Sequence, residues 1–190
     1  MNSQMWTGEK VRLSMDNPEI MADAFARWSR DSEYFRLLDS SAAQLWSVNK
    51  FKEWLKKDLE KPAQTEIFFS IRTLEDDRLL GFIGLGAIQW SQGDAWVAIG
   101  IGDRQDWGKG YGTDAMRLIL DYAFRELNLH RVSLDVFSYN PRAIRSYEKT
   151  GFKIEGRVKN TLLREGQRYD EVFMGILRSD WESAYKQVGE

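Results

Sequence analysis

A chain of 190 residues with no cysteine and a single histidine excludes several kinds of chemistry. It can form no disulfide, it offers no thiolate nucleophile, and it leaves His130 without partners for a zinc site, so no metal is expected. A net charge of −2 gives no basic field to attract nucleic acid, and 43% hydrophobic residues predict one globular domain over residues 1–190.

The N-terminal third is predicted to contain one strand followed by two helices. Lys10 to Met15 alternates polar and apolar residues, which is typical of a strand. Asn17 and Pro18 supply an N-cap and a first-turn proline for a helix that reaches about Arg30. A second helix near Val48 to Leu59 carries one apolar stripe, made of Phe51, Trp54, Leu55 and Leu59.

The middle of the chain is predicted to form three antiparallel strands, a turn and a helix. The strands are Glu66–Thr73, Arg78–Trp90 and Ala95–Ile101, with polar turn residues between them. The turn, called the glycine turn below, is Trp107-Gly108-Lys109-Gly110-Tyr111-Gly112-Thr113. It opens an amphipathic helix from about Gly112 to Leu127.

The remaining elements complete a mixed α/β order. A strand from His130 to Phe137 precedes a helix that Asn140 caps and Gly151 ends, and a hairpin of Phe152–Leu163 and Tyr169–Leu177 follows. The order βααβββαβαββ predicts an α/β (mixed α+β) fold, with a mixed sheet and helices on both faces.

The glycine turn has the composition of a phosphate-binding segment. Glycines at alternate positions allow close approach to the backbone, and a helix N-terminus offers free N–H groups and a positive dipole end. It is not a P-loop, because Gly110 follows Lys109 where Ser or Thr is required, and Thr113 breaks the dinucleotide fingerprint. From the turn alone, a glycine-rich turn without a ligand is the alternative.

Together with a second motif, the glycine turn resembles the GCN5-related N-acetyltransferase (GNAT) superfamily. Trp107 to Gly112 corresponds to the signature Gln/Arg-x-x-Gly-x-Gly/Ala, with Trp107 in the leading place. The signature Asn-x-x-Ala-x-x-x-Tyr-x-x-x-Gly-Phe appears as Asn140, Ala143, Tyr147, Gly151 and Phe152. The resemblance extends from about Arg78 to Trp181 and favours the branch of ribosomal-protein N-terminal acetyltransferases and spermidine acetyltransferases.

The resemblance implies a mostly antiparallel sheet with a splayed strand at an acetyl-CoA site, and acetyl-CoA as acetyl donor without a metal. Amides of residues 108 to 113 would hold the pyrophosphate, and the splayed strand would pair with the pantetheine arm. Lys109 and Arg104 could add positive charge there, with solvated surface cations as the alternative. The implied cofactor-binding residues are Gly100, Ile101, Gly102, Trp107, Gly108, Lys109, Gly110, Tyr111, Gly112, Thr113, Asn140, Ala143 and Tyr147.

Catalytic roles follow from the same resemblance. The Tyr147 phenol would protonate or hydrogen-bond the departing thiolate, although without the resemblance Tyr147 would be read as a core aromatic residue. Many relatives carry a basic glutamate on the splayed strand, and Trp96 occupies that position here. Asp135 is therefore the candidate base, with a solvent-facing structural role as the alternative, and Asp170 and Glu171 are weaker candidates.

The expected reaction is direct attack of a primary amine on acetyl-CoA in a ternary complex. Without a strong base an α-amine is favoured, because its pKa of about 7.7–8.0 lies well below the 10.4 of lysine. A polyamine or a small-molecule amine is the next candidate, and a non-catalytic coenzyme A-binding module is the alternative of another class. The acceptor pocket is expected near Tyr34, Phe35, Leu37 and Leu38, whereas Trp90 is expected in the core.

The expected setting is cytoplasmic, because residues 1–10 lack the apolar core of a signal peptide. No stretch of the sequence is apolar enough to cross a membrane, so neither a membrane nor nucleic acid is an expected partner. A monomer or a homodimer is expected.

Overall fold

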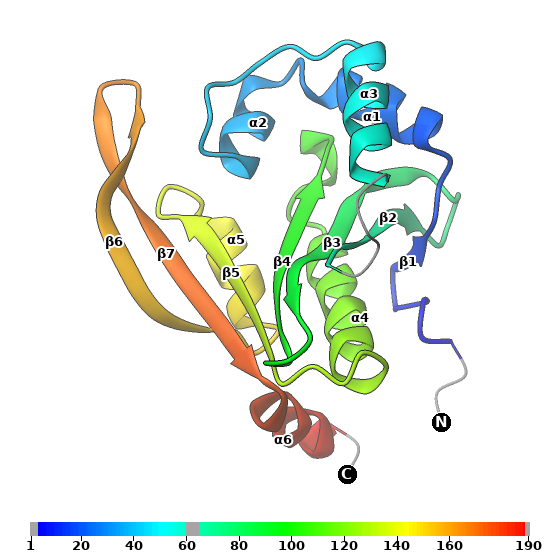
Figure 1. The fold of residues 1–190 in the computed structure, drawn as a ribbon, viewed down its shortest axis with the longest axis vertical. Helices are drawn as coiled ribbons and strands as arrows, with labels where there is room; N and C mark the ends of the chain where they lie inside the picture. The colour runs from blue at the N-terminus through cyan, green and yellow to red at the C-terminus, as the bar shows by residue number, and fades with distance from the viewer. Residues whose placement is uncertain (1–3, 60–64, 189–190) are drawn as a thin grey trace.

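The computed structural model describes residues 4–59 and 65–188, without the side chains of 55–59 and 185–188. The predicted stripe positions Leu55 and Leu59 thus lie outside the described side chains. Within the described residues, one sheet has the strand order β1-β2-β3-β4-β5-β7-β6 (Figure 1). The strands are β1 (Val11–Ser14), β2 (Ile67–Thr73), β3 (Leu79–Gln89), β4 (Asp94–Ile101), β5 (Arg131–Phe137), β6 (Lys153–Arg164) and β7 (Gln167–Leu177).

Helices cover both faces of this sheet. They are α1 (Pro18–Trp28), α2 (Ser32–Leu38), α3 (Val48–Leu59), the 3₁₀ turn η1 (Arg104–Asp106), α4 (Tyr111–Arg125), α5 (Pro141–Glu148) and α6 (Arg178–Val188). Successive strand residues point to opposite faces, so Phe82 packs with α1 and α2 while Ile83 joins the core beneath α4. The predicted fold class, a mixed sheet with helices on both faces, is confirmed.

The contact between β4 and β5 is short. Every other neighbouring pair in the sheet is antiparallel, but β4 and β5 are parallel and pair only from Asp94 to Trp96 with Arg131 to Ser133. Beyond Trp96 the two strands diverge, as Figure 1 shows. The splayed strand implied by the resemblance is confirmed, and the divergence leaves one edge of β4 without a strand beside it.

Asp114 fixes the start of the sheet to the start of α4. Its carboxylate, only 5% exposed, accepts the backbone N–H groups of Glu9 at 3.3 Å, Lys10 at 2.8 Å and Val11 at 3.0 Å. A Cβ on Gly8 would lie 2.5 Å from this carboxylate, so only glycine fits there. The N-terminal segment thereby holds the helix that carries the glycine turn.

Two helices and one residue differ from the sequence prediction. Helix α2 has a good N-cap, because Asp31 accepts the N–H groups of Glu33 and Tyr34, but its seven residues are too few for a periodic pattern. Helix α6 follows β7 directly at Arg178, with no turn residue to separate them. The placement of Trp90 in the core was wrong, since Trp90 lies at the β3–β4 turn and is 50% exposed.

Candidate active site

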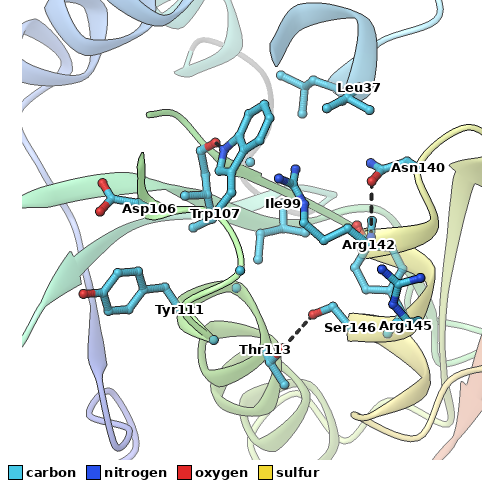
Figure 2. A pocket seen from close by; sticks show the side chains of 18 of the residues that line it. Leu37, Ile99, Asp106, Trp107, Tyr111, Thr113, Asn140, Arg142, Arg145 and Ser146 are labelled. Carbon is cyan, nitrogen blue, oxygen red and sulfur yellow. Dashed lines mark hydrogen bonds between the residues drawn. The ribbon is translucent and has the colours of Figure 1, made fainter. Parts of the chain in front are cut away.

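A cavity opens between α2, the end of β4, the glycine turn and the start of α5 (Figure 2). Gly108 and Gly110 have φ values of +77° and +89°, which L-residues with a side chain adopt only under strain. Gly110 is the N-cap of α4, and no side chain caps this helix. The first-turn amides of α4 are therefore available to an anion in the cavity.

Positive charge reaches the cavity from α5. Arg142, Arg145 and Lys149 recur at intervals of three and four residues, lie on one helix face and line the cavity. A hydrogen bond of 2.7 Å between the hydroxyls of Thr113 and Ser146 joins this helix to α4 (Figure 2). The sequence prediction missed these three cations, although their helical spacing after Asn140 was a usable signal.

The cations predicted from the turn are already paired with carboxylates. Lys109 Nζ lies 3.4 Å from the buried Asp106, which also accepts two hydrogen bonds from Arg78. The guanidinium of Arg104 binds Asp31 and Glu33 on α2. Neither Lys109 nor Arg104 lines the cavity, so α5 rather than the turn supplies the charge at its wall.

Trp107, in the leading place of the first signature, closes the end of β4. Its indole N–H donates to the carbonyl of Ile101 at 2.7 Å, and the Arg142 guanidinium lies 3.9 Å from its ring centroid (Figure 2). Because Gly102 N–H donates to Leu80 on β3, alternation directs the polar backbone groups of Ile99 and Ile101 toward the gap. A ligand can therefore pair with β4 along this edge.

The two glycines at the end of β4 leave room for side chains of the protein itself. A Cβ on Gly100 would lie 2.6 Å from Phe82 and 3.0 Å from the Tyr34 hydroxyl. A Cβ on Gly102 would lie 1.9 Å from the Trp28 ring, and Gly102 does not line the cavity. Packing within the protein alone therefore requires glycine at both positions.

Asn140 and Tyr147 lie on the α5 side of the cavity. Asn140 is the N-cap of α5, where its side-chain oxygen accepts the N–H of Ala143 at 3.2 Å. Burial is the main reason that the pKa of the Tyr147 phenol rises to about 12. The nearby carboxylate of Asp135 also raises this pKa, and the Arg142 guanidinium opposes it. The phenol therefore stays protonated at neutral pH.

Asp135 has a second carboxyl group, that of Glu171, as a neighbour. Val132, Leu134 and Val136 point into the core, so Asp135 points to the opposite face of β5, beside Glu171 of β7. Desolvation is the main cause that raises the pKa of each of these two carboxyl groups. Asp135 also raises the pKa of Glu171, as expected for carboxyl groups that compete for one proton.

Most of the predicted site residues come together around the cavity. Gly102, Lys109 and Asp135 do not line it, and Trp96 packs edge-on against Phe173 at a separate hollow. Tyr34, Leu37 and Leu38 line the cavity but Phe35 does not. The predicted cofactor-binding residues that line it are Gly100, Ile101, Trp107, Gly108, Gly110, Tyr111, Gly112, Thr113, Asn140, Ala143 and Tyr147.

A splayed sheet edge beside a glycine-rich helix N-terminus is the architecture of a coenzyme A-dependent acyltransferase. Residues 12–153 match the family model described as an acetyltransferase (GNAT) domain, so the chain belongs to the GNAT acetyltransferase family. It is an N-acetyltransferase whose acetyl donor is acetyl-CoA.

Relatives and solved structures agree with this family. The chain is 36% identical over 181 residues to the probable N-acetyltransferase YjcK of Bacillus subtilis, covering 92% of this chain and 90% of YjcK. It is 29% identical over 177 residues to the SPbeta prophage-derived N-acetyltransferase YokL of the same organism, covering 93% and 95%. The fold is similar to that of spermidine N-acetyltransferase from Vibrio cholerae in complex with CoA and spermine (TM-score 0.79, 24% identity, covering 90% and 98%).

Two features are absent from the described residues, 4–59 and 65–188. No helix there is long and apolar enough to cross a membrane. No three or more His, Cys, Asp or Glu side chains gather there in a way that could hold a metal ion.

Proposed function

We propose that the protein acetylates a primary amine that approaches Asp135 from the face of β5 opposite the core. The observation that carries this proposal is that Tyr147 lines the cavity where β4 and β5 separate, while Asp135 projects from β5 on the face opposite the core. One group can assist a leaving thiolate while the other accepts a proton from the amine. Direct attack in a ternary complex then needs no covalent enzyme intermediate.

In this proposal acetyl-CoA places its pyrophosphate on the glycine turn. The first-turn amides of α4 and the cations Arg142, Arg145 and Lys149 surround that position. The pantetheine arm pairs with the edge of β4 at the backbone of Ile99 and the N–H of Ile101, because the Ile101 carbonyl already accepts from Trp107. This pairing brings the thioester toward Tyr147. Bound this way, the donor fills the gap between β4 and β5.

Tyr147 acts on the sulfur mainly through a hydrogen bond. A thiol has a pKa of about 8.5, so complete proton transfer from a phenol with a pKa of about 12 is unfavourable. A hydrogen bond from the phenol still stabilises the negative charge that develops on the sulfur. The carboxyl pair takes the proton lost by the attacking amine, and the departing thiolate takes its proton from solvent.

The carboxyl pair of Asp135 and Glu171 serves as the base. The raised pKa values of the two carboxyl groups lie nearer to the pKa of an amine than that of an ordinary carboxylate does. Proton transfer from the amine is therefore less unfavourable. An α-amine, with a pKa of about 7.7–8.0, needs less help than a lysine side chain. We therefore place a peptide or protein α-amine first among acceptors.

A polyamine is the second candidate acceptor. The relatives include spermidine N(1)-acetyltransferase of Escherichia coli, which is 35% identical over 83 residues, covering 44% of this chain and 45% of that protein. A structural neighbour was solved with CoA and spermine. These observations support a cationic acceptor of this kind without assigning it.

The proposal is tested by following thiol release from acetyl-CoA with three acceptors and identifying the acetylated amine by mass. The acceptors are a lysine-free peptide with a free α-amine, an Nα-blocked peptide with one lysine, and spermidine. We expect the highest kcat/KM with the free α-amine. A higher value with spermidine would replace the first candidate by the second. CoA binding without thiol release with any acceptor would contradict catalysis and favour a binding module.

Replacing Tyr147 tests the role of the phenol. Tyr147→Phe should lower kcat by at least about tenfold, because one hydrogen-bond donor to the developing charge is lost. The affinity for CoA, measured by calorimetry, should stay close to that of the wild type. Tyr122→Phe is a matched control, since Tyr122 packs against Trp6 and Phe69 away from the cavity. An unchanged kcat in Tyr147→Phe would remove the phenol from the mechanism.

A further inference from the structure

Tyr34 of α2 carries a buried hydroxyl that the folded chain leaves unsatisfied. The side chain is 4% exposed, and its hydroxyl oxygen has no hydrogen-bond partner among the described residues. Buried polar groups are nearly always paired, so an unpaired one within a binding cavity points to a ligand. Tyr34 lines the cavity that the proposed function assigns to acetyl-CoA.

The position of this hydroxyl along β4 is well defined. A Cβ on Gly100 would lie 3.0 Å from it, so the hydroxyl rests directly on the face of β4. Gly100 lies between Ile99 and Ile101, on the part of β4 that has separated from β5. Gly100 and the Tyr34 hydroxyl therefore lie between Trp96, the last residue of β4 that pairs with β5, and the glycine turn that follows the strand.

The helix that carries Tyr34 is anchored to the residues before the glycine turn. Arg104 of η1 donates to Asp31, the N-cap of α2, at 2.6 Å and forms an ion pair with Glu33 at 2.5 Å. Leu37 and Leu38, one turn further along α2, also line the cavity. The hydroxyl is thus held in place before a ligand arrives, which favours its use as a binding group.

The chemistry of the donor suits this position. Between its pyrophosphate and its thiol, the pantetheine arm carries a hydroxyl and two amide groups. The hydroxyl and the first carbonyl lie in the half of the arm nearer the pyrophosphate, which is the half that would pass Gly100. Burial keeps the Tyr34 phenol protonated by raising its pKa, so it can donate to either oxygen.

We propose that the Tyr34 hydroxyl donates a hydrogen bond to the hydroxyl or first carbonyl oxygen of the pantetheine arm. This inference rests on the proposed placement of acetyl-CoA along β4, and it assigns to α2 a role in binding the donor. The hydroxyl is then satisfied only in the complex, so the interaction adds to affinity and not to the stability of the free protein.

The test is Tyr34→Phe, read out by calorimetry with two ligands and by the melting temperature of the free protein. CoA should bind about three- to tenfold more weakly, the usual effect of losing one hydrogen bond. Adenosine 3′-phosphate 5′-diphosphate, which lacks the arm, should bind with unchanged affinity. The melting temperature of the free variant should equal or exceed that of the wild type, because the hydroxyl has no protein partner to lose.

Three outcomes would overturn the inference. They are an unchanged affinity for CoA, an equal loss of affinity for both ligands, and a lower melting temperature of the free variant. The first would mean that the hydroxyl only holds a water molecule. Tyr122→Phe serves again as the control for loss of a phenolic hydroxyl outside the cavity. Because only binding is measured, the result does not depend on which amine is acetylated or on whether Tyr147 is catalytic.

Discussion

At the scale of single residues, Asp135 shows how a position that is ordinary in the sequence becomes chemically distinct in the fold. An aspartate that alternates with buried strand residues usually faces solvent, and Asp135 does point away from the core. Its diagonal neighbour on the adjacent strand β7 is another carboxyl group, Glu171, and no spacing in the sequence connects the two residues. Neighbouring carboxyl groups disfavour each other's charged form, and Asp135 accordingly raises the pKa of Glu171.

This pairing leads to a pH-dependent prediction for Asp135→Asn. At pH 8 the variant should lose about a hundredfold in kcat/KM, the usual contribution of a general base. As the pH falls through the raised pKa of the pair, the wild-type base becomes protonated, so the difference between wild type and variant should shrink. The measurement is the ratio of wild-type to variant kcat/KM at each pH. The titration of the acceptor amine cancels in this ratio because it affects both enzymes equally.

The control for this measurement is Asp170→Asn. Asp170 neighbours Glu171 in the chain, but its carboxylate accepts the N–H of Asn160 within the β6–β7 hairpin. The ratio of wild type to this variant should not depend on pH. If Asp135→Asn also gave a constant ratio, the base would have to be sought elsewhere.

At the scale of elements, the glycine turn was readable from the sequence because backbone conformation dictates residue type. Gly108 and Gly110 have φ values that glycine alone adopts without strain. The α5 signature was readable for a similar reason, since Asn140 and Pro141 together form a standard helix start. The sequence prediction missed helix α2, because seven residues are too few to show a helical pattern. This helix is stabilised by long-range contacts such as the one between Arg104 and Asp31, which are 73 residues apart in the chain.

One glycine of the glycine turn can be compared with a glycine elsewhere in the chain that has almost the same φ. Gly108 lies at the cavity with φ +77°, and Gly166 lies in the β6–β7 turn with φ +78°. A Cβ on either would meet no atom within 4 Å. Alanine at either position should lower the free energy of unfolding by about 1 kcal/mol, from backbone strain alone. Only Gly108→Ala should also weaken CoA binding, by about tenfold, because its methyl group enters the cavity.

Chemical denaturation and calorimetry on both variants separate these effects. Equal losses of stability with unequal losses of affinity would support the placement of the phosphates on the turn. Equal affinities for CoA in Gly108→Ala, Gly166→Ala and the wild type would contradict it.

At the scale of the whole molecule, the predictable part of the site is the part built from local backbone geometry. The order of the strands, the helices α1, α3, α4 and α5, the turn and the second signature follow from short-range patterns. The cations at the cavity, the Asp135–Glu171 pair and the Tyr34 hydroxyl depend on which elements become neighbours in the sheet. Gly100 and Gly102 illustrate the limit, because the sequence did not reveal that the side chains of Tyr34, Phe82 and Trp28 pack against them.

Long-range contacts also position the cavity within the molecule. The Asp114 carboxylate binds backbone groups about a hundred residues away in the chain, and Lys10 donates to the carbonyl of Lys109 at 2.8 Å. The N-terminal segment therefore supports the glycine turn from outside the cavity. No local pattern in either segment indicates this contact.

The cavity wall has one more consequence, which concerns the end of the catalytic cycle. The groups proposed to hold the donor are the first-turn amides of α4, the α5 cations, the β4 edge and Tyr34, and all of them face the nucleotide or the arm. Coenzyme A, the product, retains every one of these parts and lacks only a two-carbon group. It should therefore compete with fresh donor for the cavity and inhibit the reaction as it accumulates.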